Sequence, residues 1–526
     1  MRNRHGWAAP HRIPFVLLLM VGFLFAQEPE PQDEPDAPPP EAVKPTTDAS
    51  TPAFLKALDL QKAGKWAAAQ KALLAVLEKF PDSLHADVIR QRAGDNAYLG
   101  CETLHRGGPS ERRIDVAVMG DGFTIDGQDQ DLQKKWARLC LDVLFSEAAF
   151  SEYRDWFNFH FVRLASLEEG VDPSLSAEER KRIEERNRSR SNKRKVDFST
   201  ALDCKAAGPQ GQVMADPVLV RKWQRVADAE IPGVYDDRLA IAFARFGVLG
   251  MGGGGIANVG RPDRSVTVHE FGHAFVGLLD EYANNPARPT GMIIAPNASG
   301  VPDPDKVPWA HFLKKKVEGV GVFEGGATYQ KGVWRPANGC AMNIAGNQGY
   351  CPVCREAAVL RIYSYVSPID MHAPATDEEI AMNVGGDRML SVSVMRPQKH
   401  ALRVSWHVEP IAATAPAPER KESGRTGRDP DPFKEMLRGR RRAGRRGSAD
   451  RKSYDLPVMG TLSNLGRENK SDPKSLPTFE FPLGKLPEGR FRVTVRVWDP
   501  TPWVLLDPKH LLEERLTWTI TIARPK

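Results

Sequence analysis

Residues 268–282 read Val-His-Glu-Phe-Gly-His-Ala-Phe-Val-Gly-Leu-Leu-Asp-Glu-Tyr. On an α-helix with 3.6 residues per turn, His269 and His273 lie one above the other on the same face, so both imidazoles can bind one metal ion. Glu270 lies beside them. This H-E-x-x-H pattern is typical of zinc sites in which two histidines hold the metal and the glutamate is the general base for a water molecule. The segment therefore predicts a zinc site on a helix.

The third ligand is expected downstream, because such a zinc ion takes three protein ligands and a water. On a continuous helix, at about 1.5 Å per residue, Asp280 would lie roughly 16 Å from His269, too far to share an ion. Gly277 can end the helix, because glycine adopts left-handed conformations at little cost. We therefore predict that the helix breaks at Gly277. Asp280 is the predicted third ligand, and Glu281 is the alternative.

Two other interpretations of the motif are open from the sequence alone. Histidines at helical spacing can be ordinary surface residues. Thr267 and Glu270 also fit a capping box, in which both side chains would bond to the backbone at the start of a helix.

Three further segments of the chain, together with the motif segment, carry a resemblance to a known family. Together, and in this order along the chain, the four resemble the IgA-peptidase family of secreted bacterial zinc metallopeptidases over roughly residues 112–365. The resemblance implies a metzincin-like catalytic domain, one catalytic zinc ion and hydrolysis of peptide bonds; it does not identify immunoglobulin as the substrate. The three further segments are Val118–Thr124, Phe150–Asn158, and Cys340–Met342 followed by Tyr350–Glu356.

The same resemblance gives expectations for residues around the metal. Met342 would be the methionine whose turn underlies the zinc ion in metzincins. A transition-state oxyanion needs a hydrogen-bond donor or a positive charge. Tyr329 is our candidate for that role, with Arg335 and His311 as alternatives between which the sequence does not choose.

The six cysteines are an even number, which in an oxidising compartment favours disulfides. Cys351 and Cys354 have the spacing of a zinc ribbon, with Cys340 as their nearby companion. A cysteine-rich zinc site would need a fourth ligand that is not evident nearby in the sequence. We therefore predict a disulfide between Cys340 and one of the pair in preference to a second zinc site.

The amino end has the features of a signal peptide. Arginines precede an apolar run of eleven residues, 15–25, which Ala26 follows. This run suits a signal-peptide core and is shorter than the about 20 apolar residues that span a bilayer. We predict a signal peptide over 1–26 and a mature chain that is secreted, periplasmic or in the cell envelope, without a membrane span. Retention of the segment as an uncleaved anchor is the alternative.

Composition and periodicity divide the rest of the amino half. Residues 27–52 are rich in Pro, Glu, Asp and Ala and predict a disordered linker. Residues 53–104 have apolar residues at helical spacing around a Gly-x-Trp turn. They resemble one tetratricopeptide-like unit, although a plain helical hairpin packed on the next domain fits equally well. Residues 105–372 alternate strand and helix patterns and form the predicted catalytic domain.

The period changes to two in residues 373–526, where apolar and polar residues alternate in several segments. This pattern predicts an immunoglobulin-like β-sandwich that serves as an accessory or partner-binding module. Residues 411–474 interrupt it with a Pro-, Gly- and Arg-rich insertion that we expect to be disordered. The chain as a whole is therefore predicted to be α+β.

The net charge of +6 comes from two basic runs, 179–195 and 420–452. Neither run interleaves aromatic residues as a base-stacking surface would, so we read both as solvated insertions and predict no nucleic-acid partner. Residues 250–255 formally satisfy G-x-G-x-x-G, but no phosphate-binding helix start follows them. We expect a turn beside the motif helix, at an edge that can admit an extended peptide as an added strand.

The predicted function is that of a zinc endopeptidase acting on a protein or peptide. The sequence contains no G-x-S-x-G nucleophile elbow to support a serine hydrolase. Two alternatives are a non-catalytic envelope or surface protein with a vestigial metal site, and a zinc amidase acting on cell-wall peptides. Glu270 argues against the first, because a glutamate at that place is not needed to bind the metal.

Overall fold

The computed structural model describes residues 48–63, 65–83, 85–95, 97–190, 193–207, 211–343, 348–411, 467–469 and 476–525. The predicted signal peptide lies outside these residues, as do most of the predicted linker and most of the basic insertion. No helix in the described part of the chain is both long enough and apolar enough to cross a bilayer.

The described residues include a central six-stranded sheet in the order β1-β3-β2-β6-β8-β7. Its four inner strands run parallel, and the edge strands β1 and β7 run antiparallel to their neighbours. Every residue of β2 and β6 is buried, as expected for a parallel sheet covered on both faces. The strands are β1 (Tyr98–Arg106), β2 (Ile114–Asp121), β3 (Phe157–Leu164), β6 (Leu239–Ala244), β7 (Met251–Gly253) and β8 (Ile256–Val259).

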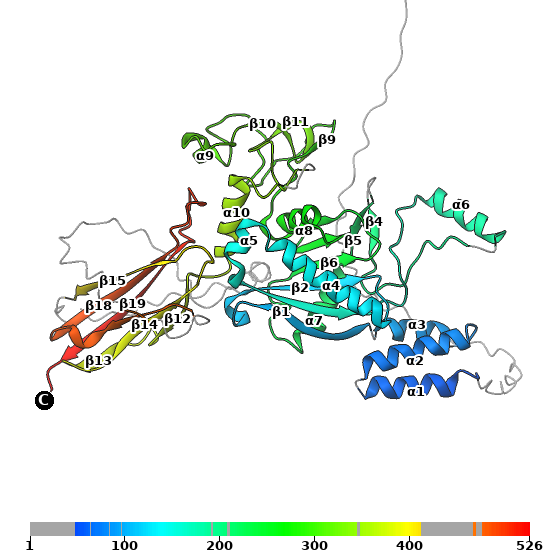
Figure 1. The fold of residues 1–526 in the computed structure, drawn as a ribbon, viewed down its shortest axis with the longest axis horizontal. Coiled ribbons are helices and arrows are strands. Elements are labelled where there is room, and N and C mark those ends of the chain that lie inside the picture. Colours follow the sequence, from blue (N-terminus) through cyan, green and yellow to red (C-terminus); the bar gives the residue numbers. More distant parts are fainter. Residues whose placement is uncertain are drawn as a thin grey trace, which may run out of the picture. The chain divides into compact units, whose positions relative to one another are not determined.

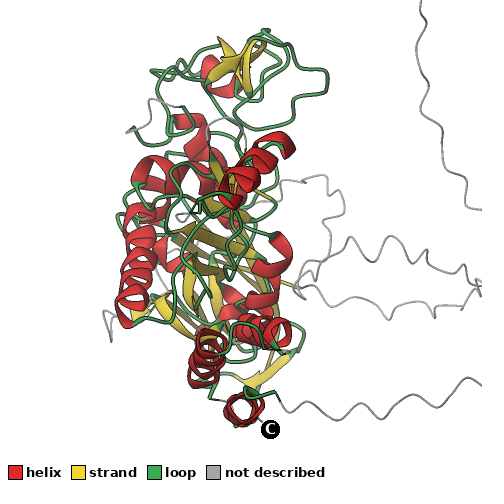
Figure 2. Ribbon diagram, turned by 90° about the vertical axis from the view of Figure 1, so that its right-hand side faces the viewer, coloured by secondary structure: helices red, strands yellow, loops and turns green. Residues whose placement is uncertain are grey.

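Helices cover both faces of this sheet (Figures 1 and 2). Val116 and Val118 of β2 belong to a core shared with α4 and α8, whereas Ala117 and Met119 belong to a core shared with α7. This alternation follows from the period of two along a strand. The three helices are α4 (Gly127–Leu144), α7 (Pro217–Asp228) and α8 (Arg264–Phe271).

Shorter elements connect these strands and helices. Before β3 lie η1 (Ser110–Arg112), α5 (Ala148–Glu152) and η2 (Arg154–Trp156); between β3 and α7 lie α6 (Ala177–Arg188), β4 (Lys205–Ala207) and β5 (Gln212–Met214). After α8 follow η3 (Gly272–Val276), β9 (Ala283–Asn285), α9 (Ala310–Lys314), β10 (Phe323–Gly326), β11 (Thr328–Arg335) and α10 (Pro352–Tyr363).

The amino-terminal helical segment differs from the prediction at its end. It contains three helices with a small core of their own, α1 (Thr51–Lys62), α2 (Trp66–Lys79) and α3 (Ala86–Asp95). The buried side-chain amide of Gln70 donates to the carbonyl of Ala165, which follows β3. Strand β1 then joins the central sheet, so the boundary predicted at 104/105 is wrong: the sheet already begins at Tyr98.

The carboxyl-terminal part consists of two four-stranded sheets, β12-β14-β17-β16 and β13-β19-β18-β15. Trp406 of one sheet packs against Phe481 of the other, with ring centroids 5.4 Å apart. Their strands are β12 (Ile369–Ala373), β13 (Ile380–Asn383), β14 (Met389–Val394), β15 (Arg403–Pro410), β16 (Arg467–Asn469), β17 (Thr478–Pro482), β18 (Gly489–Trp498) and β19 (Glu513–Ala523), with η4 (Leu483–Lys485) after β17.

Two boundaries in this part are corrected. β12 pairs with β14, so the sheets begin at Ile369 and not at residue 373. β16 lies within the segment predicted to be disordered, yet it pairs with β17. The two-sheet arrangement agrees with the period-two pattern, while the immunoglobulin-like topology stays a prediction.

Candidate metal centre

The helix that carries the motif begins at Arg264, three residues before Thr267. The side chain of Asp263 accepts from the backbone N–H of Val266 and caps α8. Thr267 is buried inside the helix, so the capping-box interpretation of Thr267 and Glu270 is wrong.

The helix ends where the sequence predicted. After α8, residues 272–276 form one π-helical turn, and Gly277 adopts a left-handed conformation with φ of +80°. The backbone N–H groups of Gly277 and Leu278 both donate to the carbonyl of Gly272. The π turn was not predicted, because no residue in it breaks the helical pattern.

This break returns Asp280 to the two histidines. Its Oδ1 lies 3.0 Å from His269 Nε2 and 3.2 Å from His273 Nε2, and the two Nε2 atoms are 3.0 Å apart. Ligands bound tetrahedrally at about 2.0–2.1 Å from zinc are separated by about 3.3 Å. The structure therefore brings the three predicted ligands to separations that a zinc ion requires.

A hydrogen bond from Nδ1, on the side of the ring away from the metal site, fixes the orientation of each imidazole. His269 Nδ1 donates to the carbonyl of Ala341 at 2.9 Å, and His273 Nδ1 donates to that of Leu278 at 2.6 Å. A carbonyl oxygen only accepts, so each neutral ring carries its hydrogen on Nδ1 and directs a lone pair from Nε2 into the site. Two lone pairs facing one another at 3.0 Å call for a cation between them. The donor set therefore fits a metal ion.

The pKa shifts of Asp280 and His273 agree with the binding of a cation at this site. Burial opposes ionisation of Asp280, but the hydrogen bonds that His269 and His273 donate when a proton takes the place of a cation on Nε2 hold its pKa well below the usual range. Burial lowers the pKa of His273, and the hydrogen bond and charge of Asp280 outweigh that effect and raise it. The site thus strongly favours a positive charge beside the Asp280 carboxylate.

Glu270 lies against the glycine-rich edge strand β7. Its side chain is buried, and burial raises its pKa. A Cβ atom at Gly250 would lie 2.5 Å from Glu270 Cγ, and one at Gly252 would overlap the Glu270 carbonyl oxygen. The glycines are thus needed for close approach to the motif helix. β7 is a strand where the sequence predicted a turn.

Met342 is buried under the motif helix. Its Sδ lies 2.8 Å from the place a Cβ on Gly272 would take, and its carbonyl accepts from the backbone N–H of Glu281 at 2.7 Å. The predicted methionine therefore lies below the helix, next to the carbonyl of Ala341 that orients His269.

Sequence reasoning missed Tyr282. Its ring stacks on His269 with centroids 6.2 Å apart. Burial, together with the nearby Asp280 charge, raises the pKa of Tyr282, so the phenol stays neutral beside the carboxylate. Its place directly after Asp280 and Glu281 was the signal that could have drawn attention to it.

Two of the three candidates for oxyanion stabilisation are bound to partners outside the metal site. His311 Nε2 pairs with Glu356 at 2.6 Å, and Arg335 binds the backbone carbonyls of residues 324, 325 and 337. Tyr329 lies on β11, two residues after Ala327, whose N–H donates to the Asp280 carbonyl at 2.6 Å. Of the three, Tyr329 is thus on the segment bonded to the metal-site loop.

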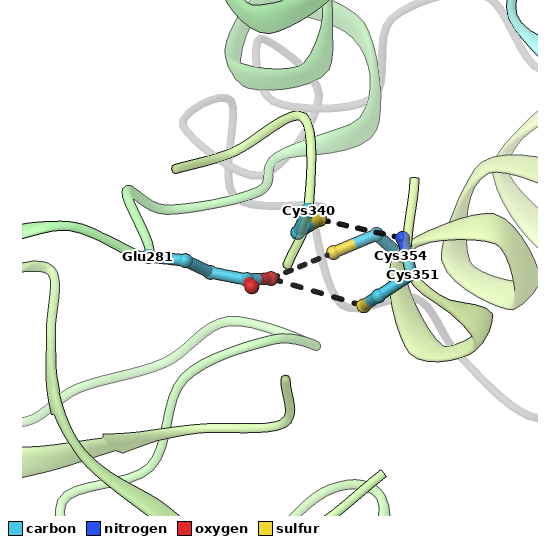
Figure 3. A group of neighbouring side chains, drawn as sticks. All are labelled: Glu281, Cys340, Cys351 and Cys354. Atoms are coloured by element: carbon cyan, nitrogen blue, oxygen red, sulfur yellow. Dashed lines mark hydrogen bonds between the residues drawn. The ribbon is translucent and has the colours of Figure 1, made fainter. Parts of the chain in front are cut away.

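The disulfide prediction is wrong. All six cysteines lie among the described residues, and each is a free thiol. Cys340, Cys351 and Cys354 instead surround the carboxylate of Glu281 (Figure 3). Burial, with a contribution from Cys340, raises the pKa of Glu281 to about 8. Glu281 was missed as their companion because it lies 59 residues before Cys340, and its side chain faces this cluster rather than His269 and His273.

Comparison with protein families identifies the class of the domain as a peptidase. Residues 103–185 match the family described as IgA Peptidase M64. The match runs from β1 through β2, α4 and β3 into α6 and includes two of the segments that carry the resemblance, 118–124 and 150–158. This part of the chain is therefore similar to the IgA peptidase M64 family. A search of curated proteins gave no match.

Proposed function

We propose that this protein is a secreted or envelope-located zinc endopeptidase. The observation that carries the proposal is the convergence of His269, His273 and Asp280 within 3.2 Å of one another, with both Nδ1 atoms bonded to carbonyls. The peptidase-family segment in the same α/β domain supports it.

The three ligands would hold a zinc ion that, when bound, polarises the scissile carbonyl and acidifies a water molecule. Glu270 is the neighbouring carboxylate that can take the proton of this water and pass it to the leaving amine. Its burial suits this role, because a raised pKa brings the carboxylate closer to the basicity that proton transfer near neutral pH requires. Tyr282 stacks on His269 and keeps a neutral phenol beside Asp280.

The edge strand β7 offers a place for the substrate. It pairs with β8 on one side and is the last strand of the sheet on the other. Met251 and Gly253 are exposed, and the strand packs directly on the motif helix at Glu270 and His273. An extended peptide adding to this edge would be bound through its backbone, with its carbonyl groups passing the metal ligands.

Metal removal tests the proposal. We expect the purified mature chain to cleave a mixed peptide library, to lose this activity when a chelator strips the zinc, and to regain it on addition of zinc but not of magnesium. Cleavage that continues undiminished after the zinc content has fallen to zero would overturn it.

A further inference from the structure

A second group of metal-ligand atoms lies in the same domain and plays no part in the proposed chemistry. One carboxylate oxygen of Glu281 and the sulfurs of Cys340, Cys351 and Cys354 all lie within 4.8 Å of one another, and all four residues are buried. Figure 3 shows the side chains pointing toward a common centre from three segments: the loop after α8, the segment around Cys340, and the start of α10. We propose that this cluster binds a second, structural zinc ion.

The ligand types and separations suit zinc. Cys354 Sγ lies 3.0 Å and Cys351 Sγ 3.9 Å from Glu281 Oε1. Tetrahedral zinc with bonds of about 2.3 Å to sulfur and 2.0–2.2 Å to oxygen requires ligand separations of about 3.5–3.8 Å, which the observed distances bracket. Four protein ligands leave no open position, as is usual for a structural rather than a catalytic site.

The hydrogen bonds of the described residues leave one buried oxygen of this cluster unsatisfied. Glu281 is fully buried, and its Oε2 has no hydrogen-bond partner among the described residues. Asn297, also fully buried, donates to Oε1 at 3.1 Å and thereby orients the carboxylate. Burying a carboxyl group with an unsatisfied oxygen is costly. A cation bound by the carboxylate removes this cost, whereas thiols, which are weak donors, do not.

A disulfide explains the cluster less well. It would join two of the three sulfurs and leave the third beside Glu281, still without a cation. The backbone N–H of Cys351 donates to Cys340 Sγ at 3.4 Å. An N–H directed at sulfur stabilises a thiolate ligand, and the Cys-x-x-Cys pair at the start of α10 has the spacing of one half of a zinc-binding ribbon.

The position of the cluster gives the ion a role. Glu281 follows Asp280, and Cys340 precedes Ala341, whose carbonyl orients His269. The segments around Glu281 and Cys340 both contribute to the first site. The second zinc ion would thus connect these two segments with the amino end of α10. Loss of an outer support of this kind costs about 10–100-fold in metal affinity, so we expect the first site to bind zinc more weakly by that factor when the second is removed.

Metal and thiol counts on the unaltered full chain test the proposal first. We expect two zinc ions per chain by elemental analysis. We also expect six reactive thiols when the protein is unfolded with chelator and without reductant. A single zinc ion per chain that is lost in His269→Ala/His273→Ala would overturn the proposal, and a count of four thiols would assign two of the cysteines to a disulfide instead.

Variants then locate the ion. The double variant His269→Ala/His273→Ala should retain one zinc ion, and its cobalt-substituted form should keep the near-ultraviolet absorption of thiolate bound to cobalt. Cys354→Ser should lose that absorption, whereas Cys140→Ser, a buried cysteine of α4 outside the cluster, should keep it. A double-histidine variant without zinc would contradict the proposal. The ion retained by the double-histidine variant is expected whether or not the protein cleaves peptides, so a failure of the peptidase proposal leaves that count unchanged.

Discussion

Asp280 and Glu281 follow one another in the chain, but their carboxylates lie in different clusters. The Asp280 oxygen is within 3.2 Å of two imidazole nitrogens, and the Glu281 oxygen is within 3.0 Å of a cysteine sulfur. The backbone of Glu281 is held by Met342, which directs the two side chains to their separate clusters. These distances therefore favour Asp280 over Glu281 as the third ligand of the first site.

Asp280→Asn is the substitution that tests this choice. It removes the negative charge while keeping the shape, so we expect the affinity of the first site for zinc to fall by at least about tenfold. Competition with a chromophoric chelator measures that affinity. Asp305→Asn is the matched control, because Asp305 is an exposed residue whose carboxylate pairs with exposed Lys314. Wild-type affinity in Asp280→Asn would show that another residue completes the site.

At this scale the sequence predicts what depends on local spacing. His269, Glu270 and His273 follow from helical periodicity, and Asp280 follows from the need to break the helix at Gly277. The role of Glu281 does not, because it depends on Asn297 and on Cys340, Cys351 and Cys354, which only the fold brings near. The disulfide prediction failed for the same reason: cysteine parity cannot reveal a distant carboxylate.

The element on which the site depends most closely is the edge strand β7. Its glycines let a strand lie directly on the motif helix, where a side chain would collide with the backbone of Glu270. The exposed edge of the same strand is where we place the substrate. A change in β7 should therefore affect both packing and turnover.

Gly252→Ala tests the close approach. The added Cβ would overlap the Glu270 carbonyl and lie 2.7 Å from His273 Cβ, so the helix or the strand must shift. We expect a loss of about 1–3 kcal/mol in the free energy of unfolding and a fall in peptide cleavage. Gly253→Ala is the control, because its Cβ would meet no atom within 4 Å. Equal behaviour of the two variants in chemical denaturation and in cleavage would refute the argument.

Most elements of the central sheet could be predicted from the sequence. The alternation of strand and helix patterns predicted for residues 105–372 agrees with the succession of β2, α4, β3 and β6, because the apolar patterns of these elements are regular. β1 was missed because its residues are half-buried along the whole strand and show no alternation. β7 was missed because three residues rich in glycine carry no strand pattern.

On the scale of the whole molecule, the residues of the carboxyl-terminal sheets share one hydrophobic core with the α/β domain. A buried polar cluster also joins them. Asp499, directly after β18, accepts from the hydroxyls of Tyr153 and Tyr363 at 2.8 and 2.7 Å and lies 2.7 Å from His400 Nε2. Its side chain is fully buried. We infer that the two parts unfold together.

Asp499→Ala tests this coupling. It leaves two buried hydroxyls and an imidazole without their acceptor, so we expect a loss of roughly 3 kcal/mol or more in the free energy of unfolding. Chemical denaturation followed by tryptophan fluorescence and by circular dichroism should give a single transition at lower denaturant concentration. Glu379→Gln, which weakens the exposed contacts of Glu379 with Arg490 and Thr521, should leave the transition nearly unchanged. Separate transitions for the two parts, or no shift in Asp499→Ala, would contradict the inference.

The α+β class and the two sheets of the carboxyl-terminal part were predictable from periodicity. Their fusion into one core was not, because it depends on contacts such as those of Asp499 with residues over a hundred positions away. For the same reason the predicted boundary at 372/373 fell inside β12.

The measurement that tests the central claim most directly is made on Glu270→Gln, side by side with the unaltered chain. Zinc content and cleavage of a mixed peptide library are determined for both. Because only the proton acceptor is lost, we expect the variant to bind as much zinc as the wild type and to cleave about 10²–10⁴-fold more slowly. Equal cleavage by the two proteins would show that Glu270 is not the general base and that the proposed peptidase mechanism is wrong.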